Sequence, residues 1–193
     1  MDTGILILAA GNSSRLGEPK QLLKFNGTSL LRNVTEEALK TTQNIVMVTG
    51  FNHTLLVKEV ENLNVIAVEN LNWKDGMGSS IRVGINKLLK AFPDIENCII
   101  AVCDQPYITS SVFNELIQKH KETLKGIVAS KYSGILGTPV LFEQKYFKHL
   151  LNLTGNEGAR RMIQKFKEDI AEVSFEKGAI DIDTPQDYKN LTS

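Results

Sequence analysis

The sequence predicts an α/β fold in which a mostly parallel sheet is covered by helices on both faces. Short apolar runs alternate along the chain with amphipathic stretches that have helical spacing. The runs are continuously apolar, as expected for strands that are buried on both faces. No repeat, low-complexity tract or Pro/Gly-rich linker divides the 193 residues. We therefore expect a single three-layer α/β/α domain spanning residues 1–193.

The individual elements follow from these runs in chain order. Seven strands are expected, at Ile5–Ala9, Ile45–Thr49, Val65–Val68, Cys98–Val102, Gly126–Ala129, Pro139–Phe142 and Ala171–Phe175. Five helices are expected between or after them, at Leu30–Leu39, Leu55–Leu63, Ile81–Leu89, Val112–Ile117 and Ala159–Phe166. Open sheets of this kind bind ligands beyond the carboxyl ends of their strands, so the loops that follow strands are the places to look for chemistry.

Composition and charge exclude several classes of protein. Lys plus Arg equals Asp plus Glu at 22 each, a balance that argues against a nucleic-acid-binding protein. No apolar segment approaches the roughly 20 residues that span a bilayer, and the N-terminus lacks the basic region of a secretion signal. Cys98 and Cys103 lack metal-binding spacing and lie in one apolar run, so we expect buried, reduced thiols in a cytoplasmic protein.

The loop between Ala9 and Lys20 combines small residues with two cations. Its glycines and serines allow backbone N–H groups to approach an anion closely. Arg15 supplies a planar fork and Lys20 a mobile point charge. Neither the Gly-x-Gly-x-x-Gly pattern nor the Walker pattern is present. The loop nevertheless has the composition of a phosphate cradle, and the alternative is a solvated surface loop.

The same loop resembles a known signature. Leu8-Ala9-Ala10-Gly11-x-Ser13-x-Arg15-Leu16-Gly17-x-x-Lys20-x-Leu22-Leu23 resembles the loop of MobA-like nucleotidyltransferases with a GT-A-like Rossmann fold, in particular the branch of molybdenum cofactor cytidylyltransferases. The resemblance implies that this loop wraps a nucleoside triphosphate, and that Arg15 and Lys20 neutralise charge as pyrophosphate leaves. The implied nucleotide-binding residues of the loop are Leu8, Ala9, Ala10, Gly11, Ser13, Arg15 and Lys20.

The segment from Trp73 to Ile81 places small residues at a predicted helix start. Gly78, Ser79 and Ser80 would present N–H groups and hydroxyls at that N-terminus. Helix capping by serine accounts for the same residues without a ligand, and both roles can hold together. The resemblance implies that all three bind the nucleotide, whereas we expect Trp73 to serve packing.

Asp104 stands at the carboxyl end of a predicted strand, in Cys103-Asp104-Gln105-Pro106. A carboxylate in this place can hold Mg²⁺, which takes oxygen ligands and substrate phosphates. An aspartate that forms a turn with its own backbone is the alternative. The resemblance favours the metal role, and it gives Asp104 a place in the catalytic set beside Arg15 and Lys20.

The segment from Asp181 to Asp187 holds three more carboxylates. Thr184, Pro185 and Asp187 have the spacing of a helix start. Asp181 and Asp183 alternate with isoleucines, so in extended chain both carboxylates face one side while Ile180 and Ile182 face the core. The resemblance implies that Asp183 is the second metal ligand and that Asp181 supports it.

Two segments resemble the acceptor side of the family but depart from its pattern. Thr138, in Gly137-Thr138-Pro139, replaces the usual histidine of a Gly-His-Pro motif. Asn156, in Gly155-Asn156-Glu157-Gly158-Ala159-Arg160, replaces the usual aspartate. The acceptor is therefore the part of the reaction that the resemblance specifies least.

The resemblance as a whole implies an Mg²⁺-dependent enzyme, with Mn²⁺ as a substitute, that transfers CMP from CTP to a molybdopterin-type acceptor and releases pyrophosphate. Related guanylyltransferases usually carry Leu-Ala-Gly-Gly where this chain has Leu-Ala-Ala-Gly, which favours CTP over GTP. The alternatives are GTP as donor, another phosphorylated acceptor, or a non-catalytic chaperone for the molybdenum cofactor. Besides these small molecules we expect transient contact with a molybdoenzyme or its chaperone, and no nucleic-acid or membrane partner.

Overall fold

A central sheet of seven strands organises the computed structural model, which describes residues 2–13 and 16–192. In spatial order the strands are β5 (Ile66–Glu69), β4 (Ile45–Thr49), β1 (Thr3–Ala9), β6 (Asn97–Val102), β8 (Ile135–Glu143), β7 (Ile127–Tyr132) and β9 (Ile170–Ser174). Among these strands β8 alone runs antiparallel to its neighbours. The mostly parallel sheet predicted from the sequence is confirmed.

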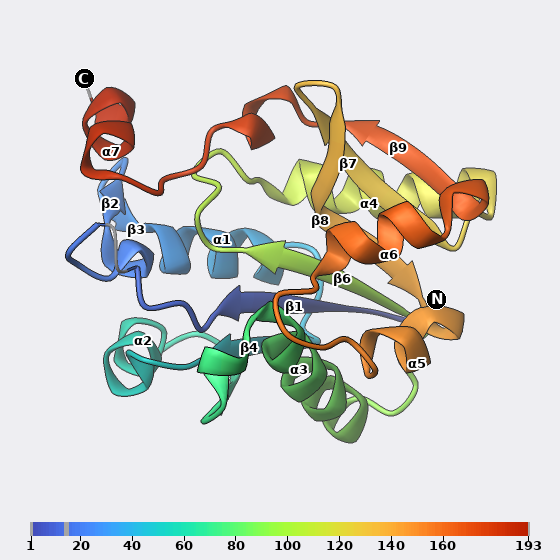
Figure 1. Ribbon diagram of the computed structural model, residues 1–193, viewed down its shortest axis with the longest axis horizontal. Helices are drawn as coiled ribbons and strands as arrows, with labels where there is room; N and C mark the ends of the chain where they lie inside the picture. The colour runs from blue at the N-terminus through green and yellow to red at the C-terminus, as the bar shows by residue number, and fades with distance from the viewer. Residues whose placement is uncertain (1, 14–15, 193) are drawn as a thin grey trace.

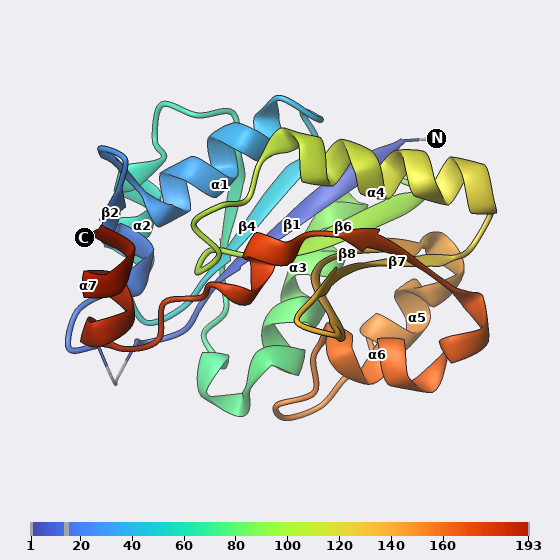
Figure 2. The same cartoon turned by 90° about the horizontal axis from the view of Figure 1, so that it is seen from above.

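Helices cover both faces of the sheet, as Figures 1 and 2 show. One face carries α1 (Leu30–Leu39), α2 (His53–Glu59) and α4 (Ser110–Thr123). The other carries α3 (Met77–Ala91), α5 (Phe147–Leu150) and α6 (Ala159–Lys165). The three-layer α/β/α arrangement therefore buries the sheet completely at its centre.

Strand β1 shows why its sequence reads as a continuous apolar run. Leu6 and Leu8 pack into the core on the α3 side, whereas Ile5 and Ile7 pack into the core on the α1 side. Successive side chains of a strand point to opposite faces, so a strand between two helical layers needs apolar residues at every position. Both faces of β1 are buried along its whole length.

The segment from Ile182 through α7 packs against the residues that follow the loop after β1. Helix α7 (Pro185–Thr192) lies beside the short hairpin of β2 (Lys24–Phe25) and β3 (Thr28–Ser29) in both views (Figures 1 and 2). Ile182, fully buried, packs with Leu23 and Leu30 in a small third core. This packing fixes the residues on either side of Ile182, and two of those are carboxylates.

Several boundaries differ from the sequence-based expectations. Helix α4 is longer than the predicted 112–117, and α3 begins before the predicted Ile81. The predicted strand 139–142 is the second half of the longer β8, and the β2–β3 hairpin and α5 were not expected. Cys98 and Cys103 are free and buried, as expected. None of the helices within the described residues is long and apolar enough to cross a membrane.

Candidate nucleotide site

A cavity of about 290 Å³ opens at the carboxyl ends of β1 and β6. Seven of the residues predicted to form the site line it: Leu8, Ala9, Ala10, Gly11, Lys20, Ser80 and Asp104. They come from the end of β1, the loop after it, the first turn of α3 and the residues after β6. Parallel strands thus gather residues that are distant in sequence, as the fold predicts. Ser14 and Arg15 lie outside the described residues.

The loop after β1 is held in shape by Gln21, a residue that the sequence reasoning missed. The Gln21 side chain is 1% exposed, and its Nε2 donates to Ala9 O at 3.0 Å and to Gly11 O at 2.8 Å. Ser13 is not among the residues that line the cavity, and its Oγ accepts a hydrogen bond from Lys20 N at 3.0 Å. The hydrogen bonds of Gln21 and Ser13 thus connect the residues directly after β1 to Lys20 and Gln21 beside the cavity. Buried loop carbonyls need donors, and which residue supplies them here is decided by contacts of the folded chain.

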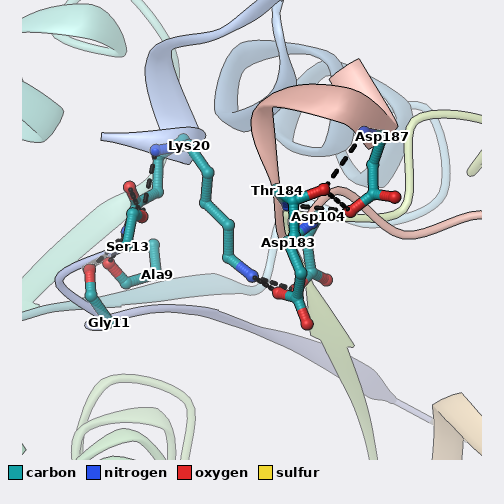
Figure 3. Close-up of polar contacts among 9 residues, drawn as sticks. Ala9, Gly11, Ser13, Lys20, Asp104, Asp183, Thr184 and Asp187 are labelled. Carbon is teal, nitrogen blue, oxygen red and sulfur yellow. Dashed lines mark hydrogen bonds and ion pairs between the residues drawn. The ribbon is translucent and has the colours of Figure 1, made fainter. Parts of the chain in front are cut away.

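Lys20 reaches across the site to two carboxylates (Figure 3). Its Nζ lies 2.6 Å from Asp104 Oδ2 and 3.1 Å from Asp183 Oδ1. Burial by itself would lower the pKa of Lys20, but the charge of Asp104 and hydrogen bonds to both carboxylates raise it above its ordinary value. The ammonium is therefore charged at neutral pH, and two carboxylates converge on one cationic nitrogen.

Asp104 and Asp183 are the donor set that could hold a divalent cation. Both offer carboxylate oxygens, the ligands that Mg²⁺ prefers, and their oxygens already meet at a cation in the Lys20 ammonium. Among the described residues no cluster of three or more His, Cys, Asp or Glu gathers as a metal site. A metal here would need additional oxygen ligands from a substrate, which is typical of Mg²⁺ in phosphate chemistry.

Of the three small residues predicted to bind the nucleotide at the start of α3, only Ser80 lines the cavity. Ser80 lines the cavity, whereas Ser79 is 2% exposed and its Oγ donates to Asn72 O and Gly76 O. The N–H of Gly78 donates to Gly155 O at 3.0 Å. The polar groups of Gly78 and Ser79 are thus engaged within the protein, and neither residue lines the cavity. Neither serine caps the helix, because the N-cap residue is Gly76.

Trp73, Met77 and Asn156 also line the cavity. Trp73 packs edge-on against Phe51, with ring centroids 5.6 Å apart, so the expected packing role is present beside exposure to the cavity. The resemblance implies a place for Asn156 on the acceptor side, and in the structure Asn156 lines the first cavity together with Trp73. This position could not be predicted from the sequence, because the approach of residues 155–156 to Gly76 depends on the tertiary fold.

The segment that carries Asp183 confirms the predicted helix start. Asp187 Oδ2 accepts hydrogen bonds from Thr184 N and Thr184 Oγ1, each at 2.7 Å, while Thr184 Oγ1 accepts from Asp187 N. These hydrogen bonds lower the pKa of Asp187. Ile182 is buried as expected, but the expectation for Ile180 is wrong. Its side chain is 43% exposed, because a 3₁₀ turn over Glu176–Ala179 ends just before it and no extended strand carries it into the core.

A second cavity of about 390 Å³ shares Val102 and Asp104 with the first. Its other lining residues are Gln105, Tyr132, Ser133, Ile135, Thr138, Gly178, Ala179 and Asp181. Burial, followed by the charges of Asp104 and Asp183, raises the pKa of Asp181. Burial also raises the pKa of the Tyr132 hydroxyl. Thr138, for which the resemblance implies a place on the acceptor side, lines this cavity. The side chain of Arg161 is 63% exposed and pairs with Glu157 on the surface.

Comparison with known proteins shows the family to which the chain belongs. The family model described as the MobA-like NTP transferase domain matches residues 5–171. The molybdenum cofactor cytidylyltransferase of Escherichia coli is 23% identical over 95% of this chain and 92% of its own length. The purine catabolism protein PucB of Bacillus subtilis is 26% identical over the same two shares.

A solved structure shows the same fold. The crystal structure of Rv0371c from Mycobacterium tuberculosis aligns with a TM-score of 0.81 at 24% identity, over 98% of this chain and 96% of that one. A second structure of Rv0371c contains manganese, with a TM-score of 0.78 at 22% identity over 99% and 98% of the two chains. The matched domain extends over most of the chain and includes the loop, Lys20 and Asp104. The protein therefore belongs to the MobA-like NTP transferase family.

Proposed function

We propose that this nucleotidyltransferase-family protein is an Mg²⁺-dependent enzyme that transfers CMP from CTP to a molybdopterin-type acceptor and releases pyrophosphate. One observation carries the proposal: Lys20, Asp104 and Asp183 converge beside a cavity whose other wall is the small-residue loop. A triphosphate needs backbone donors, a mobile cation and carboxylates for a metal, and all three kinds of group meet here.

The loop, the lysine and the two carboxylates each have a separate role in this reaction. N–H groups of the loop from Ala9 to Gly11 bind phosphate oxygens, and Lys20 approaches the phosphorus at which substitution takes place. Asp104 and Asp183 would hold the Mg²⁺, which when bound supplies charge neutralisation on the triphosphate. An acceptor phosphate is already ionised, so its oxygen can attack the α-phosphorus without a general base. Positioning and charge neutralisation are then sufficient for catalysis.

The preference for CTP rests on Ala10. This residue is 7% exposed and lines the first cavity, so its methyl group takes space that a glycine would leave to a larger base. Titration calorimetry with CTP, GTP and ATP in the presence of Mg²⁺ tests the preference. We expect the tightest binding for CTP, and equal or tighter binding of GTP would overturn the cytidylyl assignment while leaving the class of enzyme intact.

A non-catalytic chaperone for the molybdenum cofactor is the alternative of a different class. Two carboxylates that share one lysine favour an enzyme, because binding alone does not require a pair of metal ligands. Release of pyrophosphate from CTP in the presence of a molybdopterin acceptor distinguishes the two. Binding of both substrates without any pyrophosphate release would establish the chaperone. The family relationship and the name of the Escherichia coli relative support the choice of acceptor.

A further inference from the structure

We propose that Lys20 is an exchangeable counter-ion of the Asp104 and Asp183 carboxylates. Its ammonium holds the position between them that a divalent cation would take, and it leaves this position when a triphosphate binds it. The metal and the triphosphate therefore bind as a coupled pair, and the metal alone binds weakly. This inference rests on the proposed function, because it takes Asp104 and Asp183 as the metal ligands and a triphosphate as the anion.

The Lys20 ammonium lies where a metal shared by the two carboxylates would have to lie. Its Nζ is 2.6 Å from Asp104 Oδ2 and 3.1 Å from Asp183 Oδ1, and Figure 3 shows the side chain extended toward both. Mg²⁺ needs oxygen ligands at about 2.0–2.1 Å, so an ion bridging these oxygens would take the space of the ammonium. Each carboxylate has a second oxygen, but an ion held there would remain close to a like charge. Lysine and metal thus compete for one pair of carboxylates.

The acids around Lys20 need a cation between them. Asp104 is only 20% exposed, so water screens its charge incompletely, and Asp181 lines the second cavity beside it as a further acid. If the ammonium left and nothing replaced it, Asp104 and Asp183 would repel each other. Entry of a divalent cation removes that repulsion. The charge balance therefore couples the departure of the ammonium to the arrival of the metal.

The exchange requires a movement of the Lys20 side chain alone. The backbone is fixed, because Lys20 N donates to Ser13 Oγ at 3.0 Å and Lys20–Leu22 form a 3₁₀ turn. The long stem beyond it is flexible. Lys20 also lines the first cavity together with Gly11, so a triphosphate bound there lies beside the same side chain. The triphosphate competes with the carboxylates for the ammonium, and its oxygens add the ligands that two carboxylates lack.

Coupling of this kind is reciprocal, as thermodynamic linkage requires. Loss of the ammonium should strengthen binding of the metal alone. Loss of a carboxylate that holds the ammonium should strengthen binding of a triphosphate without metal. A lysine that only bound phosphate would leave the affinity for the metal alone unchanged, so the two cases differ in a measurement that needs no turnover.

The first experiment titrates the full-length protein with Mn²⁺ alone, and electron paramagnetic resonance reports the free ion. Lys20→Met keeps an unbranched apolar stem and removes the charge. We expect it to bind Mn²⁺ about 10-fold or more tightly than the wild type, a usual size for coupling between two binding events. Lys24→Met is the matched control, because it removes the same charge from an exposed residue of β2 that does not line the first cavity. It should bind Mn²⁺ as the wild type does.

The second experiment reads the same coupling from the other side, and it does not depend on the folding of a Lys20 variant. Inorganic tripolyphosphate is titrated by calorimetry in buffer freed of metal ions with a chelating resin. Asp104→Asn should bind it about 5-fold or more tightly than the wild type, because Lys20 loses its shorter ion pair. Asp187→Asn removes the same charge, but its carboxylate bonds to Thr184 and the Asp183 N–H. It should match the wild type.

A gain in Mn²⁺ affinity in Lys20→Met that is absent, or no larger than the gain in Lys24→Met, would overturn the inference. An Asp104→Asn variant that binds tripolyphosphate no more tightly than Asp187→Asn would overturn it as well. Neither experiment contains a nucleoside or an acceptor, so the proposed reaction is tested separately. CMP transfer by the wild type without this coupling would refute the inference alone, whereas coupling in both experiments without CMP transfer would refute the proposed reaction alone.

Discussion

Lys20 and Asp104 form an ion pair of 2.6 Å between residues 84 positions apart in the chain. Their side chains are only 18% and 20% exposed, so solvent screens the pair less than it screens a surface ion pair. The pair joins the loop after β1 to the end of β6. Asp183, from the segment just before α7, also pairs with Lys20. The predictions about catalysis follow from this meeting point.

Lys20→Ala should lower kcat for CMP transfer more than it raises the KM for CTP. That pattern identifies an interaction that is strongest in the transition state, as expected for a cation at the phosphorus under attack. Lys20→Arg should fail to restore turnover, because a planar fork does not replace a compact ammonium between two carboxylates. Steady-state kinetics with CTP varied at fixed acceptor measures both. Wild-type kinetics in Lys20→Ala would show that the loop has no part in catalysis.

Arg15→Ala should give the opposite pattern. From its position in the loop sequence we expect Arg15 to hold the β- and γ-phosphates, so its loss should raise the KM for CTP substantially and lower kcat less. The same kinetic series measures it. A fall in kcat as large as that of Lys20→Ala, with an unchanged KM, would contradict this division of roles.

Asp104→Asn and Asp183→Asn should each lower kcat by about 100-fold or more, because each loses charge that would hold the metal against the departing pyrophosphate. Asp187→Asn is the matched control in the same segment. Its carboxylate accepts hydrogen bonds from Thr184 and from the backbone N–H of Asp183 but does not contact Lys20, so the substitution should lower the melting temperature slightly and largely spare turnover. Near-full activity of both metal-site variants at saturating Mg²⁺ would rule out the two-carboxylate site.

Gln21→Leu should raise the KM for CTP and destabilise the protein by about 1–3 kcal/mol, since the carbonyls of Ala9 and Gly11 lose their shared donor. Gln43→Leu is the control, because the Gln43 amide donates to Leu39 O in an exposed position. Chemical denaturation and CTP titration measure the two effects. If Gln21→Leu bound CTP as tightly as the wild type does, CTP binding would not depend on the hydrogen bonds that Gln21 donates to the loop.

Asp169 should make the fold sensitive to acid. Burial would raise its pKa, but hydrogen bonds from Tyr146, Gly126 N and Lys145 lower it from 3.8 to about 2. A lowered folded-state pKa contributes stability that is present above pH 3.8 and is lost as the pH falls through about 2. Asp169→Asn should therefore cost up to about 1.5 kcal/mol at pH 7, after allowance for solvent screening of a partly exposed group.

That difference between Asp169→Asn and the wild type should shrink between about pH 4 and pH 2, because the wild-type carboxylate becomes protonated there. Urea denaturation at a series of pH values measures it. Asp94→Asn, which removes an exposed carboxylate from the turn before β6, controls for the change in net charge. A difference that stays constant across this range would show that Asp169 acts through packing alone.

The fold could be predicted from the sequence because burial on both faces leaves a plain apolar signal in each strand. Ile5–Ala9 and Ile45–Thr49 read as continuous runs, and both are buried strands. The β2–β3 hairpin has two-residue strands and no such run, so nothing in the sequence distinguished it from a loop. The antiparallel orientation of β8 could not be predicted either, since an apolar run reads the same in a parallel and in an antiparallel strand.

The candidate site was predictable where chemistry requires unusual residues in a short stretch. The loop after β1 and Asp104 at a strand end are of this kind, and the structure brings Lys20 and Asp104 together. Gln21 and Tyr132 were missed because their roles depend on contacts made only in the folded chain. The Gln21 amide donates to the carbonyl groups of Ala9 and Gly11 in the folded loop. The Tyr132 side chain occupies space that Gly137 and Gly178 leave open.

Asp183 follows every strand of the sheet in the chain, so the residues of the site are translated far apart in time. Lys20 and Asp104 are both translated before Asp183, which lies beside Lys20 where Ile182 packs with Leu23 and Leu30. A segment that is translated after all seven strands of the sheet thus supplies one of the two carboxylates that contact the Lys20 ammonium. A ribosome that has translated the loop and the whole sheet has therefore not yet added the second carboxylate of the site.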